Sequence, residues 1–190
     1  MARSTMAAIF QDLRDMTQTA PGDWTLGAIN YWDDDQLQRV LDANQMIIYN
    51  EPIRPLDEYS GGTLLTKRYP TGFHNLETSM GGTAVFTLVD GSNAVISGTA
   101  YAVDYRNGLV TFHQNTGGAV YYLTGYAYNL NRAAAAIWRI KADYYATAYD
   151  VSTDNHSLKR SQLMAQCEAR AARYEQMDGP SSVFAERGDS

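Results

Sequence analysis

The chain has 190 residues, a formal net charge of −6, 45% hydrophobic residues and 19% charged residues. This composition excludes a globally disordered chain, and the length favours one domain, or one domain with a large insertion. The acidic balance argues against a protein that grips nucleic acid through its phosphates. An acidic protein can still surround DNA without holding it, because like charges repel.

The single cysteine and the N-terminal sequence indicate the cellular compartment in which the protein is assembled. Cys167 is the single cysteine, so no intrachain disulfide is possible, and we interpret it as a small buried hydrophobe on a helix face. The N-terminus has no basic stretch followed by an apolar run, which predicts that there is no secretion signal. The apolar runs are too short to span a membrane. These features favour assembly in a reducing cytoplasm.

Two helices are predicted at the start of the chain. Residues 5–18 repeat apolar side chains at helical spacing, and Pro21 and Gly22 follow as a stop signal. Residues 33–45 form the second helix, with Asp33 as its N-cap and Gln36 as the partner in a capping box. The buried stripe of this second helix is expected to contain Leu37, Val40 and Leu41.

The middle of the chain is predicted to be an antiparallel sheet. Val, Tyr, Thr and Phe are frequent there, and Gly, Asn and Asp mark the turns. The strongest hairpin prediction joins 101–105 to 109–113 through Arg106, Asn107 and Gly108. The predicted strands are 46–54, 62–69, 83–89, 94–105, 109–114 and 119–128.

Helical patterns return at the end of the chain. Residues 129–150 form a helix capped by Asn129 or Asn131, with four consecutive alanines that favour the helical state. Residues 156–177 form another, capped by Ser157 or Ser161 and ended by Gly and Pro. The apolar face of this last helix is predicted to contain Leu163, Cys167, Ala171 and Tyr174.

These elements predict an α+β fold, in which a helical bundle of N- and C-terminal helices carries a large antiparallel β insertion. The C-terminal helix pair is expected to pack on the N-terminal helices. The predicted division is 1–45 for the N-terminal helices, 46–128 for the β-rich insertion, 129–178 for the C-terminal helix pair, and 179–190 for an extended C-terminal arm.

Enzyme motifs are weak in this sequence. The three carboxylates Asp33–Asp35 fit helix capping better than metal binding, because consecutive side chains diverge. His74, His113 and His156 fall in three different elements without metal-ligand spacing. A triad assembled in space stays open as an alternative, although no serine has a nucleophile-elbow motif. We predict no catalytic, cofactor-binding or metal-ligating residue and no cofactor.

Tyrosines are concentrated in the last strand and the following helix. A stacking platform for single-stranded nucleic acid would interleave such rings with basic residues, and residues 119–131 contain no Lys or Arg. Packing or subunit contact is therefore the better interpretation. The tyrosines concerned are Tyr121, Tyr122, Tyr126, Tyr128, Tyr144, Tyr145 and Tyr149.

Three segments carry a resemblance to a known family. "YWDDDQLQRVLDAN" at 31–44 resembles the Trp-(Ser/Thr)-Asp-Asp-x-Leu-x-x-x-Leu signature of the head–tail connector (adaptor) proteins of tailed bacteriophages. "YYLTGYAYNLNRAAAAIW" at 121–138 resembles their Gly-x-x-Tyr-Asp-hydrophobic run into an alanine-rich helix. Residues 149–177 resemble their closing link and long helix. Asp33 replaces the usual Ser or Thr, Asn129 stands where Asp is common, and the sheet is larger than in the simplest members.

The resemblance implies a structural virion protein of the phage neck and no enzymatic activity. Such adaptors form a homo-oligomeric ring of about twelve subunits that docks on the portal protein. The ring extends the DNA channel, encircles the genome without sequence-specific binding, and meets a downstream neck or tail protein. It is assembled in the bacterial host cytoplasm, and the C-terminal arm commonly reaches a neighbouring ring. Here the expected contact residues of that arm are Val183, Phe184 and Arg187.

Other functions stay open on the sequence alone. Another neck component, such as a stopper or tail-completion protein, would differ only in the partner that it touches. A β-rich carbohydrate- or surface-binding module would use the aromatic residues as a glycan platform and would be monomeric. A hydrolase would lose its activity when one of its histidines is replaced.

Overall fold

The computed structural model describes residues 2–26, 29–146, 151–153, 156–158 and 160–178. The chain divides into two compact units, which we call the helical unit and the β unit. The helical unit combines residues 8–44 with the chain from Asn129 onward, and the β unit combines Arg3–Ala7 with Gln45–Tyr128. The predicted α+β class, with N- and C-terminal helices and antiparallel strands between them, is confirmed.

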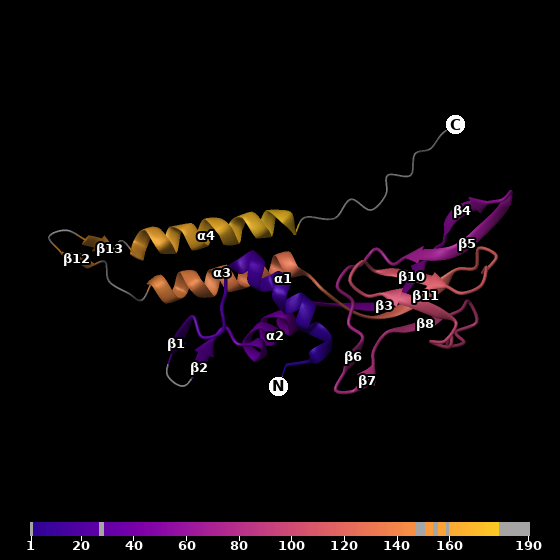
Figure 1. The fold of residues 1–190 in the computed structure, drawn as a ribbon, viewed down its shortest axis with the longest axis horizontal. Helices are drawn as coiled ribbons and strands as arrows, with labels where there is room; N and C mark the ends of the chain where they lie inside the picture. The colour runs from indigo at the N-terminus through magenta and orange to yellow at the C-terminus, as the bar shows by residue number, and fades with distance from the viewer. Residues whose placement is uncertain (1, 27–28, 147–150, 154–155, 159, 179–190) are drawn as a thin grey trace. The chain divides into compact units, whose positions relative to one another are not determined.

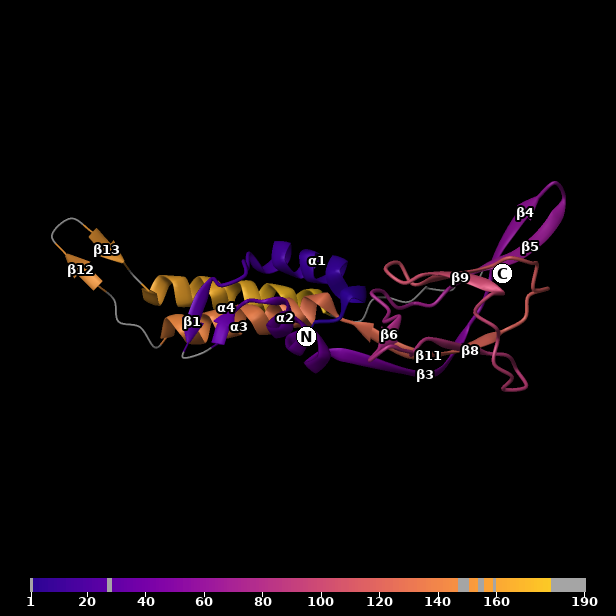
Figure 2. The same ribbon diagram turned by 60° about the horizontal axis from the view of Figure 1, so that its bottom comes forward.

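The helical unit contains four helices and two short hairpins among its described residues (Figure 1). Helices α3 and α4 run side by side in both views (Figures 1 and 2), and α2 contacts α3. The elements are α1 (Ala7–Thr17), β1 (Trp24–Leu26), β2 (Ile29–Tyr31), α2 (Asp34–Ala43), α3 (Leu130–Ala146), β12 (Val151–Thr153), β13 (His156–Leu158) and α4 (Arg160–Met177).

Helix α2 begins where the sequence predicts. The Asp33 carboxylate accepts a hydrogen bond of 2.8 Å from the backbone N–H of Gln36, which satisfies one unpaired donor of the first turn. Arg14 on α1 donates to the Asp34 carboxylate at 2.7 Å and to the Trp32 carbonyl at 2.9 Å. The Asp-rich stretch is thus a helix start that is tied to α1.

Helices α3 and α4 share a small apolar core. Trp138 and Ala142 on α3 pack against Cys167 and Ala171 on α4, and all four are buried. Two residues of the predicted α4 face, Cys167 and Ala171, are therefore confirmed as buried. The N-cap of α3 is Asn129, whose side-chain oxygen accepts from the Arg132 N–H at 3.0 Å.

The β unit contains two larger sheets and one small hairpin. The four-stranded sheet has the order β4-β5-β10-β9, and the three-stranded sheet has the order β3-β11-β8, with all pairs antiparallel. A 3-10 turn, Ser4–Met6, precedes them in sequence. The strands are β3 (Gln45–Ile53), β4 (Leu56–Ser60), β5 (Thr63–Pro70), β6 (Ser79–Met80), β7 (Thr83–Ala84), β8 (Thr87–Val89), β9 (Tyr101–Asp104), β10 (Leu109–Phe112) and β11 (Tyr121–Tyr128).

Both larger sheets contribute side chains to one core. Aromatic rings fill much of it: Phe112 stacks on Tyr121 at 4.6 Å between centroids, and Tyr69 meets Phe112 edge-on at 5.2 Å. The buried members are Ile48, Ile53, Tyr69, Leu76, Phe86, Leu88, Val110, Phe112, Leu123 and Ala127. Burial on this scale explains why the β unit is compact.

The hairpin predicted around Arg106, Asn107 and Gly108 is confirmed, since β9 pairs with β10 through Asp104 and Leu109. Gly108 has φ +67°, and an added Cβ would lie 1.6 Å from the Phe73 carbonyl oxygen. Only glycine fits this position, because the left-handed backbone and the close approach both exclude a side chain.

Several predicted boundaries were wrong. The strand predicted at 94–105 is regular only over Tyr101–Asp104, because a turn at 97–100 interrupts it. The strand predicted at 83–89 is divided into β7 and β8. Helix α4 begins at Arg160 rather than at residue 156, since His156–Leu158 pair with Val151–Thr153 as a hairpin.

Candidate interaction surface

The residues considered for chemistry do not gather in one place. His74 and His113 are exposed, and Asp33 is used as a helix cap. Within the described ranges, no three His, Cys, Asp or Glu side chains lie close enough together to hold a metal ion. The arm residues Val183, Phe184 and Arg187, the side chain of His156, and Tyr149 lie outside the described residues.

An open hollow of about 400 Å³ lies in the helical unit. Its wall contains two cations that flank one indole ring: the Lys141 ammonium is 4.9 Å and the Arg170 guanidinium 4.5 Å from the Trp138 centroid. Lys141 is only 6% exposed. Its ammonium donates to the carbonyls of Thr17 at 3.0 Å and Gln18 at 2.9 Å, where α1 ends.

The charges around this hollow are already engaged. Arg170 donates to the Gln18 side-chain oxygen at 2.7 Å, and the Asp23 carboxylate lies 3.9 Å from the Lys141 ammonium. Burial lowers the pKa of Lys141, and the charge of Asp23 opposes that shift. Burial also raises the pKa of the Cys167 thiol, which keeps it protonated and unreactive. The chemistry here supports packing of α1 on α3.

Replacing Lys141 by Met is expected to lower the free energy of unfolding by about 2 kcal/mol, because two carbonyls at the end of α1 lose a charged donor. Urea unfolding followed by tryptophan fluorescence measures this. In the unchanged chain, stability should rise with pH between the lowered pKa of Lys141 and about 10.4, because only the unfolded lysine stays protonated there. That rise should be absent in Lys141→Met, and an identical pH profile would contradict the assignment.

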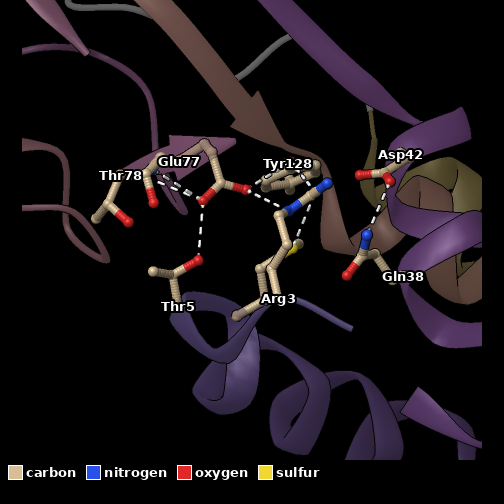
Figure 3. A network of polar contacts seen from close by, with 9 residues as sticks. Arg3, Thr5, Gln38, Asp42, Glu77, Thr78 and Tyr128 are labelled. Carbon is tan, nitrogen blue, oxygen red and sulfur yellow. Dashed lines mark hydrogen bonds and ion pairs between the residues drawn. The ribbon is translucent and has the colours of Figure 1, made fainter. Parts of the chain in front are cut away.

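A buried ion pair lies in the β unit (Figure 3). Glu77 is 2% exposed; its carboxylate forms an ion pair with Arg3 Nε at 3.2 Å and accepts a hydrogen bond from the Tyr128 hydroxyl at 2.9 Å. Arg3 also donates to the Tyr128 hydroxyl at 2.7 Å. The second carboxylate oxygen accepts from the Thr5 hydroxyl and from the Thr78 N–H, as Figure 3 shows. These contacts fix Arg3–Ala7 to the β unit.

The three-stranded sheet has an outer face that faces away from the core. Leu88 and Leu123 point inward, so the residues that alternate with them point outward. Register pairs Ile47 with Tyr126 and Tyr122 with Val89 on this side, and Val95 extends it through a bridge to Val89. We call Ile47, Tyr49, Val89, Val95, Tyr122 and Tyr126 the tyrosine face.

The tyrosine face is apolar and uncharged, and three of its six side chains are strongly exposed. Ile47 is 72% exposed, Tyr49 83% and Val95 71%. The outward positions of β3, β8 and β11 contain no Asp, Glu, Lys or Arg. Large exposed apolar patches in soluble proteins mark contact surfaces, and aromatic enrichment with depletion of charge is typical of interface cores.

A second exposed apolar feature is the tip of the β4–β5 hairpin. Tyr59 pairs with Leu64 across the hairpin, and Tyr59 is 78% exposed. Gly61 and Gly62, with φ +58° and +77°, make the two-residue turn. The tip, residues 59–64, contains no charged residue. Strands β4 and β5 reach beyond β10 in Figure 1.

The base of this hairpin is braced by a neighbouring loop. The Asn115 side-chain oxygen accepts from the Thr66 N–H at 3.0 Å and from its hydroxyl at 2.6 Å, and the Asn115 amide donates to the Leu64 carbonyl at 3.0 Å. The Gly118 N–H donates to the Thr66 hydroxyl at 2.9 Å. The Asn115 side chain thus bonds to β5 beyond the residues that pair with β10, which gives the tip a defined position.

The clustered tyrosines divide by environment. Tyr121 packs against the β-unit core, and Tyr128 is buried in the ion-pair network. Tyr122 and Tyr126 lie half-buried on the tyrosine face. The sequence identified the cluster, but it missed Ile47, Tyr49 and the β4–β5 tip. The only signal for Ile47 and Tyr49 was the apolar residues at alternate positions of β3.

Comparison of the chain with protein-family models, with curated protein sequences and with solved structures found no match. A search of the described helices for a segment long and apolar enough to cross a membrane also found none.

Proposed function

We propose that this chain is a structural subunit of the bacteriophage neck, an adaptor that forms a ring on the portal and connects head to tail. The observation that carries the proposal is the meeting of the three family-like segments. Helix α2, within 31–44, contacts helix α3, which begins within 121–138, and helix α4, within 149–177, packs along α3. Segments far apart in the sequence thus form one helical unit.

The other features support a protein that works by contact. The polar groups around the hollow at Lys141 are used for packing. The exposed apolar side chains lie mostly in the β unit, on the tyrosine face and the β4–β5 tip. Heterologous contacts repeated around an axis close a ring. A chain with net charge −6 can surround DNA without adhering to it.

The test is to mix the purified chain with the portal protein encoded in the same phage genome and to weigh the products by native mass spectrometry. We expect a ring-sized complex. A chain that ends at Asp178 should bind the portal at least tenfold more weakly, because Val183, Phe184 and Arg187 are then absent. Replacing Ser181 and Ser182 by Ala is the matched control and should leave binding unchanged.

A chain that stays monomeric and ignores the portal in both forms would overturn the adaptor assignment. Binding to a different neck or tail protein in place of the portal would move the assignment to a stopper or tail-completion protein. A monomer that instead binds glycans through its aromatic side chains would favour the surface-binding module.

A further inference from the structure

The β unit has two exposed apolar features that belong to different sheets. The tyrosine face is on the three-stranded sheet, and the tip with Tyr59 and Leu64 belongs to the four-stranded sheet. Each stays exposed within a single copy, as the exposed fractions of Ile47 and Tyr59 show. A head-to-tail contact joins two different surfaces of identical copies, and an apolar face and a projecting apolar tip can serve as those two surfaces.

Charge favours a second copy as the occupant. Copies of a chain with net charge −6 repel one another, so they can meet most easily through surfaces that carry no charge. The outward strand positions of the tyrosine face and residues 59–64 are both uncharged. Next to the tip, Glu58 and Arg68 neutralise each other in an ion pair of 2.9 Å.

Area excludes simple pairing of two tyrosine faces. The longest strand of this sheet, β3, has nine residues, and three strands about 4.8 Å apart then cover about 400 Å² at most. A stable pair of proteins buries about 800 Å² on each partner. A head-to-tail arrangement adds the hairpin to the contact area of every copy, and closure into a ring adds avidity.

We propose that the β4–β5 tip of one copy docks on the tyrosine face of the next copy and that this contact joins neighbouring subunits. The ring geometry of this inference rests on the proposed function. Tyr59 and Leu64 would cover Ile47, Tyr49 and Tyr126, and the brace at Asn115 would hold the tip at the required angle.

Cysteine cross-linking in the full chain tests the contact. Tyr59→Cys and Ile47→Cys are made separately and mixed under mild oxidation, with Cys167 kept as the buried native thiol. A disulfide dimer is expected in the mixture and not in either variant alone. The control is Thr83→Cys, at an exposed position on β7. It is mixed with either of the two cysteine variants in place of the other and should not form a disulfide dimer. A dimer of Ile47→Cys alone would overturn the proposal, because it requires two faces to pair.

A second variant tests the energetics without a thiol. Ile47→Asp places a carboxylate on the tyrosine face and should weaken self-association at least tenfold in native mass spectrometry, whereas Thr83→Asp should not. If the Ile47→Asp variant forms rings on the portal as well as the unchanged chain does, the proposed contact is wrong and the adaptor function is unaffected. Loss of portal binding by the unchanged chain would refute the adaptor function, and the mixed cross-link would still support the contact.

Discussion

Gly108→Ala is expected to unfold the β unit, with a loss of more than about 4 kcal/mol. The added Cβ would lie 1.6 Å from the Phe73 carbonyl oxygen and 2.7 Å from the Thr71 hydroxyl, so backbone must move. The backbone at φ +67° adds a further cost for any residue with a side chain. The Gly108 carbonyl also accepts from Thr71, and this link between β10 and the end of β5 would be lost.

A matched glycine separates the clash from the backbone cost. Gly117 has φ +66° and nothing within 4 Å of an added Cβ, so Gly117→Ala should cost only about 1 kcal/mol. The β unit contains no tryptophan, because Trp24, Trp32 and Trp138 all belong to the helical unit. Hydrogen exchange of β5 and β10 is therefore the right measurement. Equal protection in the two variants would contradict the role given to Gly108.

Arg3→Met is expected to cost the β unit about 3 kcal/mol, because it leaves the buried carboxylate of Glu77 without its cation. The double variant Arg3→Met, Glu77→Gln should recover part of that loss, since a neutral amide has no buried charge to compensate. Hydrogen exchange of the amides of Thr78 and Tyr128 reports the opening. The control is Arg54→Met at an exposed position of the same unit, which should change stability by less than about 0.5 kcal/mol.

The double variant decides how this result is interpreted. Recovery would identify the unpaired charge as the cause of the loss. A double variant as unstable as the two losses added together would show instead that Arg3 and Glu77 act independently, and the ion pair would then have no role in fixing Arg3–Ala7.

Local signals in the sequence predicted much of this fold. Asp33 was identified as a cap because a short acceptor precedes an apolar helical repeat, and its bond to the Gln36 N–H confirms it. The turn at Arg106–Gly108 was identified because Asn-Gly favours positive φ. In both places the chemistry that sets the structure lies within four residues.

The errors occurred where distant residues decide the structure. β4 has an exposed pattern with no apolar alternation, and it is a strand only because β5 pairs with it. The ion pair of Arg3 with Glu77 joins residues 74 positions apart, and no local pattern marks it. The bonds of Lys141 to the carbonyls at the end of α1 likewise depend on tertiary packing, and no local pattern marks them.

The order in which the chain is made has a consequence for its biogenesis. Arg3–Ala7 are synthesised more than a hundred residues before Tyr128, yet they belong to the β unit, whose last strand ends at Tyr128. The helical unit in turn cannot be completed until α4, which ends at Met177, has been synthesised. Neither unit can therefore finish folding during early synthesis, and neither can be excised by a single cut. A fragment that starts at Gln45 would bury Glu77 without Arg3, so a self-sufficient β fragment would have to be circularly rejoined to residues 3–7.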